Sequence, residues 1–165
     1  MRHVLALLSL VLMPFWFGGH SSSLAADMTI LQPRDGWRVI ETKIAFPDLV
    51  SYLKASIKAE KMGLVTQASA SAGAKGQGIT IPGNQVLGVY RNDYARRMLS
   101  ASIAAGIEAP IRFYITENEE GSSVLSWKTP SHVFAPYMGE AGEPLKALAD
   151  ELDGVFETIA QNAVE

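Results

Sequence analysis

Alternating apolar and polar residues predict a β-hairpin in residues 110–130. The residues between the two apolar sets are polar and end in a Gly-Ser-Ser segment, which is typical of a turn. A period of two places each apolar set on one face of a sheet. We expect this face to lie beneath a long C-terminal helix. The apolar residues of the two strands are Ile111, Phe113, Ile115, Leu125 and Trp127.

Helical spacing of apolar residues predicts elements that cover this hairpin. One stripe runs through Leu49, Leu53 and Ile57, and a longer one follows Pro144, which suits a first helical turn. The predicted order is β-α-β-β-α-β-β-α, in which strands outnumber helices, so we expect an α+β fold. The expected strands before the hairpin are residues 37–44, 64–70 and 85–91, and the expected helices are residues 46–62, 93–105 and about 143 onward.

Two segments lack a clear period and are interpreted as loops. Residues 71–78, which read SAGAKGQG, resemble a phosphate cradle because they combine glycines with Lys75. A P-loop needs Lys followed by Ser or Thr at a helix start, whereas Lys75 is followed by Gly76. We interpret the segment as a flexible connection, with a loop that closes over a ligand as the alternative. Residues 129–136 contain two prolines and are interpreted as the second loop.

The N-terminal residues have the three-part pattern of a secretory signal peptide. Arg2 and His3 precede an apolar run that is followed by small and polar residues, with cleavage expected before Ala26 or Asp27. The alternative is an uncleaved membrane anchor, but the run is shorter than the roughly 20 residues that span a bilayer. The prediction is therefore a signal peptide at 1–26, a tether at 27–36 and one domain at 37–165, in the periplasm or secreted, with no membrane contact after cleavage.

Charge and cysteine content exclude several function classes. Of the 14 Lys and Arg residues only Arg2 lies in the expected leader, which leaves 13 basic against 17 acidic residues. An acidic balance argues against nucleic acid as a partner. The chain has no cysteine, which excludes thiol catalysis, cysteine-zinc sites and cysteine-linked haem. An exported domain without disulfides fits a bacterial periplasm better than a eukaryotic exterior.

The remaining candidate chemistry is sparse. His132 is the one histidine beyond the expected leader. A triad with Ser131 and Glu140 is disfavoured because adjacent residues align poorly as nucleophile and base. A copper site with Met138 and Glu140 rests on weak evidence, so we expect no cofactor and no metal. The clustered acidic residues of the hairpin turn, Glu117, Glu119 and Glu120, are expected to be solvated.

Aromatic and cationic residues supply the candidates for ligand binding. Aromatic side chains at strand spacing are more often core residues than pocket walls. The set that could line a pocket comprises Trp37, Tyr90, Tyr114, Trp127 and Tyr137. The candidate ligand-binding residues are Lys75, Tyr90, Arg112, Trp127 and His132.

Residues 44–137 contain a series of short motifs. They read GLV at 63–65, AKG at 74–76, VLGVYRN at 86–92, AAGIEAPIR at 104–112 and SWKTP at 126–130. Together these motifs resemble the bacterial domain of unknown function 302 family, also called TT1751-like. The resemblance implies a TBP-like fold, in which helices grip a curved antiparallel sheet, and implies no activity. The chain departs from the family's polar residues at three places: Ser69-Ala70-Ser71, Asn92-Asp93 and Thr129.

Three hypotheses about function follow. The favoured hypothesis is a non-enzymatic periplasmic domain that either binds a small ligand or is an accessory domain. The second is an enzyme with an acid-base site formed by Glu119, His132 or Arg112. The third is a protein that binds a partner or forms a homo-oligomer through an exposed sheet edge.

Overall fold

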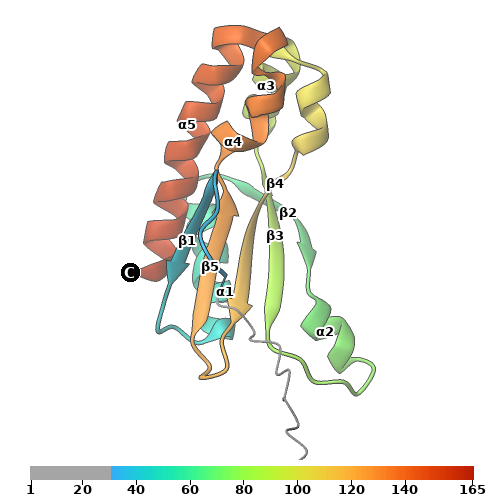
Figure 1. The fold of residues 1–165 in the computed structure, drawn as a ribbon, viewed down its shortest axis with the longest axis vertical. Helices are drawn as coiled ribbons and strands as arrows, with labels where there is room; N and C mark the ends of the chain where they lie inside the picture. Colours follow the sequence, from blue (N-terminus) through green and yellow to red (C-terminus); the bar gives the residue numbers. More distant parts are fainter. Residues whose placement is uncertain (1–30) are drawn as a thin grey trace, which may run out of the picture.

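The structure is a computed structural model that describes residues 31–165. It contains a five-stranded antiparallel sheet with the strand order β1-β5-β4-β3-β2 (Figure 1). The predicted α+β class is therefore confirmed, as is the long C-terminal helix. The strands are β1 (Trp37–Glu41), β2 (Gly63–Ala68), β3 (Asn84–Tyr90), β4 (Ile111–Glu117) and β5 (Ser123–Lys128).

Two long helices, α1 and α5, supply the apolar layer that covers one face of this sheet. Shorter helices gather at its ends, with α3 and α4 near one end and α2 near the other (Figure 1). Residues 31–36 form no helix or strand. The helices are α1 (Phe46–Ala59), α2 (Ala70–Lys75), α3 (Asn92–Ala101), α4 (Pro130–Phe134) and α5 (Met138–Val164), with 3₁₀ turns η1 (Ala104–Glu108) and η2 (Ala135–Tyr137).

The hairpin of β4 and β5 forms the centre of the core, as the alternation predicts. Phe113 pairs with Trp127 and Ile115 with Leu125, so the apolar residues of both strands share a face. The Phe113 ring lies between two aromatic neighbours. Its centroid is 5.6 Å from that of Trp127 and 4.7 Å from that of Phe156 on α5. Trp127 is only 2% exposed, which confirms it as a core residue.

The segment interpreted as a flexible glycine-rich loop instead begins with helix α2. Ser69 caps this helix, because its hydroxyl accepts a hydrogen bond from the backbone N–H of Ala72 at 3.1 Å. Four of the six residues that follow Ser69 are alanine or lysine, which favour helix. The loop prediction therefore gave too much weight to Gly73, and irregular structure begins only after Lys75.

The second predicted loop is also wrong in part, because α4 forms at Pro130–Phe134. Thr129 caps it by accepting a hydrogen bond from the N–H of His132 at 3.3 Å. Pro130 occupies the first helical turn, where its missing N–H costs nothing. A Thr-Pro pair is thus a helix start here rather than a loop signal.

Several predicted boundaries move. The first strand ends at Glu41 rather than at residue 44, and α1 ends at Ala59 rather than at residue 62. The third helix begins at Asn92, ends at Ala101 and is followed by η1, so Asn92 is not its cap. Helix α5 begins at Met138 but is broken at Gly142, where φ is 58° and ψ is −149°.

The predicted leader, 1–26, lies outside the described residues. In the part that the structure describes, no helix is both long and apolar enough to cross a membrane.

Candidate functional site: a groove on the outer face of the sheet

The face of the sheet opposite α1 and α5, here called the outer face, carries three rows of side chains that cross the strands. Strand register defines them, because residues paired across antiparallel strands share a face. The middle row contains Val39, Ser126, Tyr114, Val86 and Ala68. The row next to the hairpin turn contains Glu41, Val124, Thr116 and Asn84.

The third row, nearest α4, brings two cations together. Trp37 pairs with Lys128, and Gly88 pairs with both Arg112 and Thr66. Continuing the β4–β5 register by one residue places Arg112 opposite Lys128. The row therefore reads Trp37, Lys128, Arg112, Gly88, Thr66 across the sheet.

Gly88 is required in this row because neighbouring side chains occupy the space above it. A Cβ atom at Gly88 would lie 2.0 Å from Thr66 Oγ1 and 2.9 Å from Pro110 Cγ. Both distances are shorter than real Cβ atoms show. A side chain at this position would have to displace Thr66 or Pro110, and these two residues therefore form the surface beside Arg112.

A groove of about 580 Å³ runs along the outer face over these rows, from the start of α2 to α4. Its size lies within the range of small-molecule sites. Its polar lining residues are Asn84, Glu108, Arg112 and Lys128. The residues that make its surface largely apolar include Trp37, Ala68, Val86, Tyr114 and Val133.

Each polar residue of the groove has a distinct environment. The Glu108 carboxylate accepts a hydrogen bond from the Tyr137 hydroxyl at 2.8 Å, and this bond raises the pKa of Tyr137. Asn84 Oδ1 accepts from the N–H of Ala70 at 2.9 Å, which ties α2 to the sheet. The Lys128 ammonium lies 5.7 Å from the Trp37 ring centroid, within cation–π range.

Within residues 31–165, the two groove cations form no ion pair. Four ion pairs join side chains in residues 31–165, and their cations are Arg38, Arg91, Arg97 and Lys146. In that part of the chain, Arg112 and Lys128 therefore lie opposite each other without a carboxylate between them. Both side chains are exposed.

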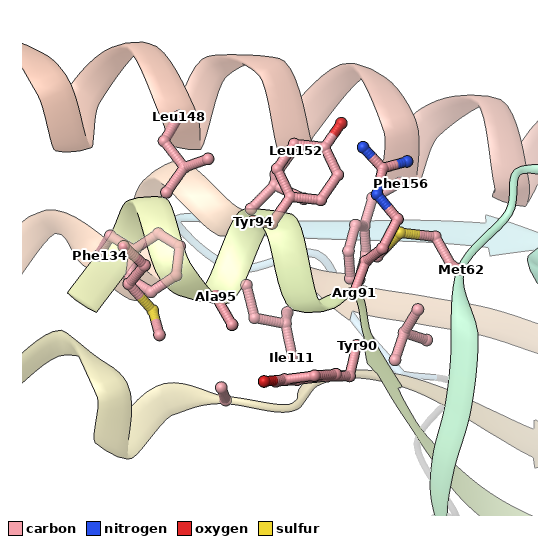
Figure 2. A pocket seen from close by; sticks show the side chains of 13 residues that line it. Met62, Tyr90, Arg91, Tyr94, Ala95, Ile111, Phe134, Leu148, Leu152 and Phe156 are labelled. Carbon is pink, nitrogen blue, oxygen red and sulfur yellow. The ribbon is translucent and has the colours of Figure 1, made fainter. Parts of the chain in front are cut away.

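A second, smaller cavity lies in the core between α3, α5 and the sheet (Figure 2). Its volume is about 40 Å³, enough for about one water molecule. Met62, Phe134 and Leu152 are among its walls, and all three are buried. We interpret it as a packing gap in the core, because it is too small for a metabolite.

Two of the residues that line this cavity, Arg91 and Tyr94, belong to a polar network (Figure 2). The Arg91 guanidinium lies 3.9 Å from the Tyr94 ring centroid and forms two hydrogen bonds with Asp93. The Tyr94 hydroxyl and Arg97 both donate to Glu151, at 2.9 and 2.7 Å. Burial, and then the bond to Glu151, raises the pKa of Tyr94. These donors and acceptors form hydrogen bonds with one another, and the network links α3 to α5. Its polar groups already have partners within the protein, so they are poor candidates for binding a ligand.

The predicted binding residues are dispersed. Arg112 lines the groove, whereas Trp127 touches it but is buried in the core. Tyr90 borders the small cavity. Lys75 lies at the end of α2 and is not among the groove residues. His132 packs against Gly36, where a Cβ atom would lie 2.0 Å from its Cγ.

The acid-base sets weighed from the sequence do not converge. Glu119 is exposed in the hairpin turn, and His132 follows the opposite end of β5. Ser131 Oγ donates to Thr129 Oγ1 at 3.2 Å. Glu140 accepts from Ser102. No cluster of three or more histidine or acidic residues suited to a metal ion occurs within residues 31–165.

Sequence reasoning missed Lys128, and it named Trp37 and Tyr114 only as members of the aromatic set. The hairpin alternation contains a signal for this face. Arg112, Tyr114 and Thr116 alternate with the apolar residues of the first strand and therefore point away from the core. Lys128 follows Trp127 on the second strand and also points away from the core. The cross-strand partners become visible only once the register is known.

Comparisons with known proteins agree on the family. The family model "Domain of unknown function DUF302" matches residues 39–161. A solved structure, an uncharacterized conserved DUF302 protein from Bacillus stearothermophilus, is similar with a TM-score of 0.69 at 15% sequence identity. The alignment covers 79% of this chain and 99% of that chain. No curated protein matches. The resemblance found in the sequence motifs is thus confirmed, and the chain belongs to the DUF302 family.

Proposed function

We propose that this protein is an exported, non-enzymatic binding protein that holds a small molecule in the groove on the outer face. The observation that carries the proposal is the groove itself, about 580 Å³ with a largely apolar wall and a few polar groups. This combination is typical of small-molecule sites. Helices α1 and α5 pack their apolar residues on the core-facing side of the sheet, whereas this largely apolar groove lies on the outer face.

Binding is favoured over catalysis because the polar groups of the groove are recognition groups. Arg112 and Lys128 are cations, and Asn84 and Glu108 already have protein partners. General acid-base catalysis needs a proton donor or acceptor in reach of the substrate with a suitably tuned pKa. Of the three residues that the enzyme hypothesis relied on, Arg112 lines the groove, whereas Glu119 and His132 do not.

Export is proposed from the sequence pattern of residues 1–26. Intact-mass analysis of protein from the periplasmic fraction should give a chain that begins at Ala26 or Asp27. A full-length mass, recovered with the membrane fraction, would contradict export of a cleaved domain.

The groove is tested by filling it. Ala68 is exposed on the outer face and lines the groove, so Ala68→Trp adds bulk there without disturbing the core. Gln67 is the matched control, because it precedes Ala68 on β2, is exposed and belongs to the opposite face. Native mass spectrometry should detect a retained small molecule in the wild type and in Gln67→Trp.

The Ala68→Trp variant should retain none and should lose the thermal stabilisation that the ligand gives. Equal retention by the two tryptophan variants would place the ligand elsewhere. An apo mass for every form, together with no thermal shift against a broad metabolite panel, would contradict the proposed function.

A further inference from the structure

We propose that the groove recognises a flat aromatic or conjugated molecule that carries one carboxylate. The inference rests on the proposed function and specifies the chemistry of its ligand. It follows from how the three rows of the outer face distribute charge, aromatic surface and small residues.

The first step is the pair of cations. Extending the β4–β5 register one residue beyond Phe113 and Trp127 places Arg112 opposite Lys128. Like charges placed opposite each other destabilise a sheet, and a carboxylate between them would remove that repulsion. None of the ion pairs in residues 31–165 involves either side chain. A guanidinium beside an ammonium provides a planar fork and a point charge for one anionic group.

The second step is the net charge of the groove. Glu108 also lines it and carries a carboxylate held by the Tyr137 hydroxyl. Two cations and one carboxylate leave a net charge near +1. A singly charged carboxylate balances this charge, whereas a doubly charged phosphate would leave a surplus of negative charge beside Glu108.

The third step is the shape of the apolar surface. Trp37 closes the end of the cationic row, and Tyr114 occupies the centre of the next row. Beside them the groove is lined by Ala68, Ala70 and Val86, whose side chains are short. A sheet surface with small residues and two aromatic rings favours a planar body over a branched one.

The test compares 2-naphthoate with three probes, each of which differs from it in one feature: the charge, the anionic group or the rigidity of the apolar body. The probes are 2-naphthoate, the uncharged 2-naphthamide with the same rings, 2-naphthyl phosphate with the same rings and a double charge, and decanoate with a carboxylate on a flexible chain. Isothermal titration of the purified wild-type protein should give the tightest binding for 2-naphthoate. We expect 2-naphthamide to bind at least about tenfold more weakly, the loss given by one charge-assisted hydrogen bond. The phosphate should bind more weakly because of its second negative charge beside Glu108, and decanoate because ordering its flexible chain costs entropy.

Charge-removing variants then locate the carboxylate. Arg112→Gln and Lys128→Gln should each weaken 2-naphthoate binding about tenfold or more and should leave 2-naphthamide binding unchanged. Arg38→Gln is the matched control, because Arg38 is an exposed arginine of the same sheet whose cross-strand partner is Trp127, on the core side. It should change the dissociation constant for 2-naphthoate by less than about twofold, because salt screens the interaction between a distant surface charge and the ligand.

The outcomes separate this inference from the proposed function. If 2-naphthamide or decanoate binds as tightly as 2-naphthoate and Ala68→Trp abolishes that binding, the groove is a binding site and the carboxylate inference is wrong. Tighter binding of 2-naphthyl phosphate would also overturn it. Equal losses in Arg38→Gln and Arg112→Gln would mean that overall charge, not the pair, attracts the anion. Binding of no probe, with no effect of Ala68→Trp on any retained molecule, would overturn both.

Discussion

Phe113 on β4 and Phe156 on α5 stack with their ring centroids 4.7 Å apart and their planes 19° from parallel. Both rings are almost completely buried, at 0% and 1% exposure. This contact packs the C-terminal helix against the core-facing side of the central hairpin. The groove lies on the opposite side, the outer face.

Removing this contact should destabilise the whole domain. We expect Phe156→Ala to lower the free energy of unfolding by about 3–5 kcal/mol, the usual cost of truncating a buried phenylalanine. Thr158→Ala, an exposed change on the same helix, should alter it by less than about 0.5 kcal/mol. Urea unfolding followed by circular dichroism measures both. A loss below about 1 kcal/mol for Phe156→Ala would contradict the packing described here.

Gly88→Ala should be destabilising because of one specific neighbour. The new Cβ atom would lie 2.0 Å from Thr66 Oγ1, and a β-branched side chain cannot easily rotate away. We expect a cost of about 1–3 kcal/mol in the free energy of unfolding. The cost should be smaller in a Thr66→Ala background, because the nearest clashing atom is then gone.

A double-mutant cycle by urea unfolding measures that difference. Gly73→Ala in α2 is the control, since no atom lies within 4 Å of its Cβ position. It should be neutral or stabilising by up to about 1 kcal/mol. An equal cost of Gly88→Ala with and without Thr66 would show that the clash lies elsewhere.

The network on Glu151 predicts a pH dependence. The hydrogen bond from Arg97, and then that from Tyr94, lowers the pKa of Glu151 below its ordinary value of 4.5. A carboxyl with a depressed pKa in the folded state stabilises the protein above the unfolded pKa, and this contribution is lost as the pH falls through the folded pKa. Because Glu151 is half exposed, with 45% of its side chain accessible, the effect should be below about 1 kcal/mol.

Unfolding free energies of the wild type and Glu151→Gln provide the measurement. The wild type should be the more stable near pH 6.5, and the difference should shrink near about pH 3. Arg97→Gln should reproduce the effect, since it removes the first cause of the shift. A difference that stays constant between the two pH values would contradict the linkage.

Ser56 links the two long helices by a buried hydrogen bond. Its hydroxyl donates to the backbone C=O of Ile159 at 2.8 Å, and Ser56 is only 5% exposed. Ser56→Ala should lower the free energy of unfolding by about 1 kcal/mol, because a buried acceptor loses its side-chain donor. Ser51→Ala, at an exposed position of the same helix, should have little effect. Equal effects of the two substitutions in urea unfolding would contradict the role of this bond.

The hairpin and the long helix could be predicted because each depends on a periodicity within one segment. Phe113 and Ile115 share a face of β4 because side chains two residues apart on a strand point the same way, and Leu148 and Leu152 share a stripe of α5 because residues four apart on a helix do. Helix α2 could not be predicted from periodicity, since its helical signal is the cap at Ser69 and a run of small residues. Glycines at positions 73, 76 and 78 are typical of a loop and lie in the same segment.

The groove was harder to predict because its residues come from several strands. Arg112 was identified as a candidate, but Lys128 becomes its neighbour only through the register fixed by the turn at 118–122. In that turn Gly121 has a φ of +86° and Asn118 accepts from its N–H. Trp37 and Ala68 enter from the two edge strands, far apart in the sequence. His132 shows the converse, because this chemically suggestive residue packs against Gly36 and does not line the groove.

The most direct test of the account is to map where a ligand binds. Amide chemical shifts in a two-dimensional ¹⁵N spectrum should change on titration of 2-naphthoate at the outer-face rows, with the largest changes at Arg112, Tyr114 and Lys128. The same titration of Ala68→Trp should leave these signals unmoved. Shifts centred instead on Met98 and Leu152 around the core cavity, or on the exposed hairpin turn, would contradict the claim that the outer face of this sheet is the binding surface.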